Sequence, residues 1–74
     1  MKLDNHIVGK VIQQIRNEKG LSQEVLSGFA GIARTHLTMI ENGTKMPNLE
    51  TIFKISEALN MKPSELIKEI EEAI

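Results

Sequence analysis

The spacing of apolar residues along the chain predicts helices throughout. Val8, Val11, Ile12 and Ile15 recur at three- and four-residue intervals, the period of a helix with one buried face. No stretch of alternating apolar and polar residues is bounded by hairpin turns, so no sheet is predicted. Capping and stop residues divide the chain into five helices, at about 5–19, 22–30, 34–42, 49–59 and 63–73.

The ends of these helices are marked by local chemistry. Ser22 and Asn48 carry side-chain oxygens that can cap a following helix, and Gly31 fits a sharp turn between two helices. Pro63 suits the first turn of the last helix, where its missing N–H costs nothing. The pattern therefore predicts an all-α protein, a single domain over residues 1–74, with a helix-turn-helix arrangement at about 22–42.

Composition narrows the class of protein. The chain has 74 residues, of which 41% are hydrophobic and 3% aromatic, so its single core must be aliphatic. It has no cysteine, which excludes disulfide scaffolds and thiolate zinc sites. Its longest apolar run is far below the roughly 18 residues that span a bilayer, and its N-terminus lacks a signal-peptide core. We expect a cytoplasmic protein with no membrane partner.

The net charge of −1 argues mildly against a nucleic-acid partner when it is taken alone. The charge is unevenly distributed, however. Residues 1–45 hold six basic and four acidic residues, a balance of +2, whereas residues 46–74 hold three basic and six acidic residues, a balance of −3. The predicted helix-turn-helix lies in the positive part.

The sequence offers no pattern typical of an active site. It contains no nucleophile–base pair, no cluster of metal ligands and no glycine-rich phosphate loop. We therefore expect no enzymatic activity, no cofactor, no metal and no small-molecule ligand.

Three runs carry the most specific signal: GLSQEVL at 20–26, AGIARTHL at 30–37 and IENG at 40–43. Together with Arg16 and the run PNLET at 47–51, they resemble the lambda-repressor/Cro-like (Xre-type) helix-turn-helix family. The resemblance covers about residues 8–66 in one register without gaps. It implies a compact five-helix domain that binds double-stranded DNA and usually acts as a homodimer.

The resemblance makes 34–42 the recognition helix, which would enter the major groove. Arg34 can donate two hydrogen bonds to guanine, the commonest specific base contact. Thr35 and Thr38 can bond base edges or present a methyl group to thymine, whereas Met39 and Ala33 can make only apolar contacts. The expected base contacts are Ala33, Arg34, Thr35, Thr38 and Met39.

Two further segments are expected to hold the DNA backbone. Gln23 resembles the family's phosphate-contacting residue and lies at a helix start, where free N–H groups attract an anion. The turn Asn42-Gly43-Thr44-Lys45 is the second clamp that the resemblance implies. Gly43 would let main-chain N–H groups approach a phosphate, and Lys45 adds charge. His36 is expected at the surface or facing a phosphate rather than bound to a metal.

Arg16 and Glu41 match a pair that forms an internal salt bridge in the family. We interpret this pair as structural, joining the first helix to the end of the third. Removing one partner of a buried pair costs about 3–5 kcal/mol.

The last helix carries an apolar stripe of Ile67, Ile70 and Ile74, flanked by acidic residues. An amphipathic helix of this kind is a reasonable dimer face. The alternative is that the stripe packs back on its own domain. Val11, Val25 and Phe29 stand where the family usually has polar residues, and are either extra core or an exposed patch.

These observations predict a sequence-specific transcriptional regulator. A two-fold dimer would place two recognition helices about 34 Å apart, so its operator should be an inverted repeat. The resemblance suggests phage-type repressors, controllers of restriction–modification operons, or antitoxins that repress their own operon. The alternative is a protein-interaction module, or an antitoxin-type regulator, that uses the C-terminal amphipathic helix.

Overall fold

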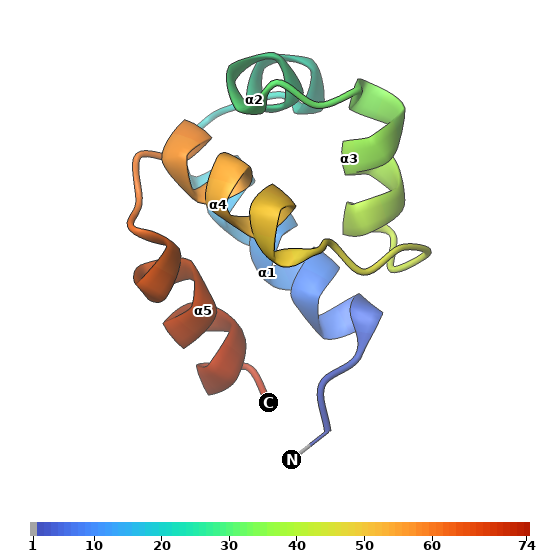
Figure 1. Cartoon of the computed structure of the whole chain (residues 1–74), viewed down its shortest axis with the longest axis vertical. Helices are drawn as coiled ribbons and strands as arrows, with labels where there is room; N and C mark the ends of the chain where they lie inside the picture. Colours follow the sequence, from blue (N-terminus) through green and yellow to red (C-terminus); the bar gives the residue numbers. More distant parts are fainter. Residues whose placement is uncertain (1) are drawn as a thin grey trace.

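Five α-helices joined by short connections make up the computed structural model, which describes residues 2–74 (Figure 1). No strand occurs within these residues, and the predicted all-α, five-helix fold is confirmed. No helix in this described part is long and apolar enough to cross a membrane. The helices are α1 (Asn5–Glu18), α2 (Gln23–Ala30), α3 (Arg34–Glu41), α4 (Leu49–Ala58) and α5 (Pro63–Glu72).

Side-chain caps begin three of the helices. The first N–H groups of a helix have no partner within it, and a short polar side chain just before the helix can accept from one of them. Asp4 accepts from the N–H of Ile7 at 2.9 Å, and Ser22 accepts from that of Val25 at 3.1 Å. Asn48 caps α4 in the same way, at 2.8 Å. The starts of α1, α2 and α4 are therefore determined by residues that are neighbours in the sequence.

Each helix contributes apolar side chains to one aliphatic core. Helix α1 contacts α3 and α5, while α2 contacts α3 and α4, and α4 also contacts α5. These contacts enclose one core between the five helices and leave the other face of α1 exposed (Figure 1). The buried apolar residues are Val8, Val11, Ile12, Ile15, Leu26, Ala30, Leu37, Ile40, Ile52, Ile55, Leu59, Leu66 and Ile70.

Helices α1 and α3 meet at Gly9, which is buried. A Cβ atom at this position would lie 2.2 Å from the carbonyl oxygen of Ile40 and 2.7 Å from that of Glu41. Real Cβ atoms do not come so close to backbone oxygens, so only glycine permits this separation of the two helices. Gly9 thereby sets how closely α3 lies against the rest of the protein.

The structure corrects one residue of the expected apolar stripe on α5. Ile70 is only 5% exposed and belongs to the core, because it points toward the space between α5 and its neighbours. Ile67 and Ile74 remain 45% and 46% exposed. The exposed part of the stripe therefore consists of two isoleucines and not three.

The structure separates the three apolar residues that stand where the family usually has polar ones. One of them belongs to the core, and the other two are exposed. Val11 is buried and extends the core of α1. Val25 and Phe29 on α2 lie at the surface, and Phe29 is 68% exposed.

Candidate nucleic-acid interface

The turn between α2 and α3 has the geometry that a helix-turn-helix requires. Gly31 follows α2 with φ of +70°, in the left-handed region that glycine occupies most easily. The N–H of Gly31 bonds the carbonyl of Gly28, and the N–H of Ile32 bonds that of Ser27. These bonds satisfy carbonyls that the end of α2 would otherwise leave open. The prediction of a sharp glycine turn at this position is confirmed.

Helix α3 is held by one face and exposed on the other. Leu37 and Ile40 are fully buried in the core. Arg34 and Thr35 occupy the first turn of α3 and are exposed. The guanidinium group of Arg34 and the hydroxyl group of Thr35 are therefore accessible to a ligand at this end of the helix.

The other residues expected at base edges are less accessible or less polar. Ala33 lies at the N-cap position of α3 and is exposed, and no side chain caps the helix there. Met39 is 37% exposed, and His36 and Thr38 are half-buried. The accessible polar groups of α3 are therefore concentrated in its first turn.

A buried ion pair joins α1 to the end of α3. The Nε atom of Arg16 donates to Oε2 of Glu41 at 2.7 Å, and Nη2 donates to Oε1 at 2.9 Å. The remaining Nη1 donates to the carbonyl of Leu21 at 2.7 Å. The hydrogen bond to Glu41 raises the pKa of Arg16 above its ordinary value, against the opposing effect of burial. The guanidinium thus stays charged while it holds α1, the start of α2 and α3 together.

The side chain of Gln23 extends this ion pair to the recognition helix. Its Nε2 donates to Oε1 of Glu41 at 2.9 Å, and its Oε1 accepts from the hydroxyl of Thr38 at 2.8 Å. The sequence predicts that Gln23 contacts a phosphate and that Thr38 contacts a base edge. The structure also couples the two side chains to each other, so each keeps only part of its hydrogen-bonding capacity for a ligand.

The turn after α3 departs from the expected backbone clamp. The N–H of Gly43 donates to the carbonyl of Ile40, and the N–H groups of Thr44 and Lys45 donate to that of Met39. These amides are already used inside the protein, so they do not form an open anion-binding nest. Any phosphate contact at this turn must come from the exposed side chains of Asn42, Thr44 and Lys45.

Gly43 also has a packing role that the sequence did not predict. It is buried, has φ of +83°, and packs under the imidazole of His6. A Cβ atom there would lie 2.8 Å from that ring. Glycine at this position therefore accommodates the N-terminal part of α1.

Sequence reasoning missed two features that position the site. Gly9 allows α1 to approach α3, and Gln23 links Glu41 to Thr38. A glycine in the middle of a strongly helical run was the available signal for the first, since glycine there is unfavourable unless something approaches closely. The second had no signal in the sequence, because the partners are 15 and 18 residues apart.

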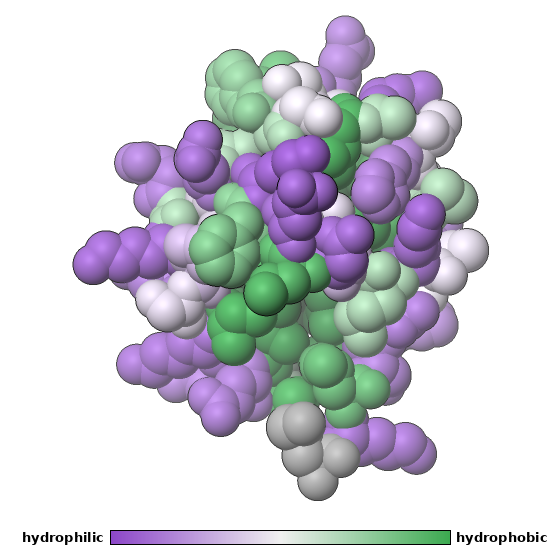
Figure 2. Space-filling model, in the orientation of Figure 1, coloured by the Kyte–Doolittle hydropathy of each residue, from purple (hydrophilic) through white to green (hydrophobic). Residues whose placement is uncertain are grey.

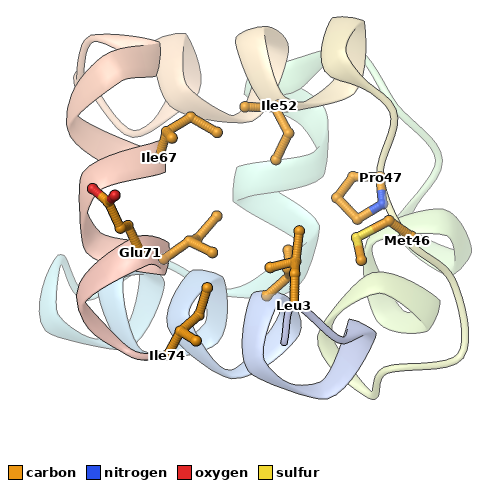
Figure 3. Close-up of a pocket in the computed structure, with 9 residues that line it drawn as sticks. Leu3, Met46, Pro47, Ile52, Ile67, Glu71 and Ile74 are labelled. Carbon is orange, nitrogen blue, oxygen red and sulfur yellow. The ribbon is translucent and has the colours of Figure 1, made fainter. Parts of the chain in front are cut away.

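Apolar side chains also surround an open groove of about 400 Å³ between α4, α5 and the start of the chain. Figure 2 shows these apolar side chains gathered over the region that α4, α5 and the start of α1 enclose. Figure 3 shows residues of α5, Ile52 of α4, the Met46-Pro47 segment and Leu3 directed toward the same space, with Glu71 on the rim. The groove is lined by Leu3, Val8, Met46, Pro47, Ile52, Ile67, Ile70, Glu71 and Ile74.

Residues 12–66 match the helix-turn-helix family HTH_3, and the chain belongs to this family of Xre- and lambda-repressor-like proteins. The class that the fold and its exposed helix define is therefore a transcriptional regulator that binds DNA sequence-specifically.

Individual relatives are also controllers and regulators. The chain is 39% identical over 62 residues to the control protein C.BamHI of Bacillus amyloliquefaciens, covering 82% of this chain and 76% of that protein. It is 36% identical over 59 residues to the ImmF control region 10 kDa protein of Bacillus phage phi105, covering 80% and 66%. Among solved structures, the restriction–modification controller C.AhdI of Aeromonas hydrophila is 34% identical, with a TM-score of 0.80 over 84% of this chain and 94% of that one.

Proposed function

We propose that this protein binds an inverted-repeat DNA operator as a homodimer and reads the major groove with α3. The observation that carries the proposal is the first turn of α3, where Arg34 and Thr35 are exposed while Leu37 and Ile40 anchor the helix in the core. A helix fixed in this way presents its N-terminal side chains in one orientation, as recognition helices do. The similarity to the control protein C.BamHI and to the ImmF control region protein supports the same function.

The proposed role is that of a repressor or an autoregulatory controller. Selection of bound sites from random DNA tests this proposal directly. We expect an inverted repeat with half-sites about one helical turn, roughly 34 Å, apart. Enrichment of no sequence, together with no retarded band on DNA from its own operon at low salt, would reject it.

Arg34 is proposed to contact guanine. Replacing Arg34 with alanine should weaken operator binding by about 1–3 kcal/mol and relax the preference at one base pair per half-site. Fluorescence anisotropy with the operator, with single-base variants and with random DNA measures both effects. Equal losses on operator and random DNA would show that Arg34 contacts a phosphate instead.

Lys45 is proposed to contact a phosphate next to α3. The main-chain amides of its turn are engaged, so its exposed ammonium group is the charge that this turn offers to DNA. The Lys45→Ala variant should bind operator and random DNA about equally less well. The slope of log K against log salt should fall by about one. Lys54→Ala on α4 is a matched control, and the proposal for Lys45 fails if both variants keep the wild-type slope.

The apolar groove beside α5 is proposed to form the dimer interface. Leu3, Ile67 and Ile74 are each between 45% and 47% exposed around it, an apolar surface that a second copy would cover. Ile67→Glu should shift the protein toward a monomer in sedimentation equilibrium and weaken binding to a complete operator by about tenfold or more. Phe29→Glu changes an equally apolar exposed residue that does not line the groove, and it should leave the mass unchanged. A dimeric Ile67→Glu variant would contradict the interface.

A second candidate function is a protein-interaction module that uses the same groove. The apolar lining of the groove would also accept an apolar helix of another protein in place of a second copy. This alternative predicts a protein that stays monomeric in sedimentation equilibrium, which separates it from the proposed homodimer.

A further inference from the structure

A chain of hydrogen bonds runs from Arg16 through Glu41 and Gln23 to Thr38 on the recognition helix. Its links are Arg16 to Glu41 at 2.7 and 2.9 Å, Gln23 to Glu41 at 2.9 Å, and Thr38 to Gln23 at 2.8 Å. The first link is buried, and the others are partly buried.

The charged end of this chain fixes the direction of every bond in it. A guanidinium group only donates, and an ionised carboxylate only accepts. Glu41 therefore requires the NH₂ group of Gln23 on its side, which turns the carbonyl oxygen of Gln23 toward Thr38. Since that oxygen only accepts, the hydroxyl of Thr38 must donate.

The hydroxyl of Thr38 has one hydrogen, and the structure gives it only acceptors. Besides Oε1 of Gln23 at 2.8 Å, the carbonyl oxygen of Arg34 lies 3.0 Å away. The hydrogen lies toward Oε1 of Gln23, because two oxygen atoms 2.8 Å apart with no hydrogen between them would repel each other, so it is used within the protein. What remains for a ligand is lone-pair density on Oγ1 and the methyl group.

We propose that Thr38 acts on DNA only as a hydrogen-bond acceptor, and that Gln23 is the positioning residue that fixes this role. This inference rests on the proposed function of α3. Thr38 lies one turn after Arg34 on the same face of the helix. In the major groove the donors are the N6 amino group of adenine and the N4 amino group of cytosine. Thr38 thus bonds an exocyclic amino group, and it makes no hydrogen bond to guanine O6, guanine N7 or thymine O4.

The accepting role of Thr38 also complements the donating role of Arg34. Arg34 donates to acceptors of guanine, whereas Thr38 accepts from an amino group, so the two residues read opposite features of the groove. Gln23 keeps its second amide hydrogen, because only one of the two is used on Glu41. That hydrogen remains available for a phosphate. Gln23 would therefore bind the DNA backbone and orient the hydroxyl of Thr38 at the same time.

The test uses the selected operator with single base analogues. Each adenine is replaced in turn by purine, and each cytosine by 2-pyrimidinone, which removes the amino group and keeps the ring. For wild-type protein, one position per half-site should lose about tenfold in affinity when its amino group is removed. Thr38→Val, which has the same shape without the hydroxyl, should bind the normal and the analogue operators equally. Thr38→Ser should restore the difference.

The role of Gln23 is measured by the same ratio of affinities. Gln23→Ala loses any phosphate contact on both operators, so that loss cancels in the ratio. We expect the tenfold ratio to fall to about threefold or less, with the helix content unchanged by circular dichroism. An unchanged ratio would remove Gln23 as the positioning residue.

The proposal for Thr38 is wrong in either of two outcomes. One is that Thr38→Val keeps the sensitivity to the amino group. The other is that 7-deazaguanine, which lacks the N7 acceptor, weakens binding by wild type but not by Thr38→Val. Failure to select any operator would instead reject the proposed function, so the two failures are distinguishable.

Discussion

Replacing Gly9 with alanine should lower the free energy of unfolding by about 3 kcal/mol. The new Cβ atom would lie 2.2 Å from the carbonyl oxygen of Ile40 and 2.7 Å from that of Glu41. Both obstacles are backbone atoms of α3, which cannot rotate away as the end of a flexible side chain can. Relief therefore requires α1 and α3 to move apart, and this opens the core at Ile40. Chemical denaturation followed by circular dichroism measures the change.

Gly28 provides a matched control in the same chain. It is also a glycine within a helix, but no atom lies within 4 Å of a Cβ atom placed on it. Gly28→Ala should stabilise the protein by about 0.5–1 kcal/mol, because alanine is the better helix former. Similar denaturation midpoints for the two variants would show that α1 and α3 do not approach as closely as the structure has them.

Replacing Glu41 with alanine should destabilise the protein by about 3–5 kcal/mol. The change leaves the buried guanidinium of Arg16 without its carboxylate and leaves the NH₂ group of Gln23 without its acceptor. Most of the loss comes from the uncompensated charge and not from the attraction itself, because the pair has already lost its hydration in the folded state.

Two comparisons isolate this effect. Glu50→Ala breaks the exposed pair of Glu50 and Lys54 at 3.9 Å and should cost less than about 0.5 kcal/mol. The double variant Arg16→Met/Glu41→Met removes both charges and should be more stable than either single methionine variant. If its loss equals the sum of the two single losses, the pair does not act as a buried ion pair.

The proposals for DNA binding depend on the same interaction. Glu41 is the acceptor that orients Gln23, and Gln23 in turn orients Thr38. A variant of Glu41 that retains its fold should therefore also alter the base preference of Thr38. The residues that stabilise the domain and the residues proposed to read DNA are thus connected by hydrogen bonds, and effects on stability and on specificity must be measured separately.

Several elements of the fold could be predicted because their causes are local. The predicted caps Ser22 and Asn48 bond N–H groups three residues further along the chain. Gly31 is required by the conformation of its own backbone. Such interactions join near neighbours and depend only weakly on the rest of the protein.

The sequence by itself determined five helices, their caps, the aliphatic core and the resemblance to the helix-turn-helix family. Each of these is a property of neighbouring residues or of the period of apolar positions. The tertiary structure decided which side chains remain free. It buried Ile70, placed His6 against Gly43, and used the hydroxyl of Thr38 inside the protein. The partners in these contacts lie far apart in the chain, and only the packing of the helices sets the distances between them.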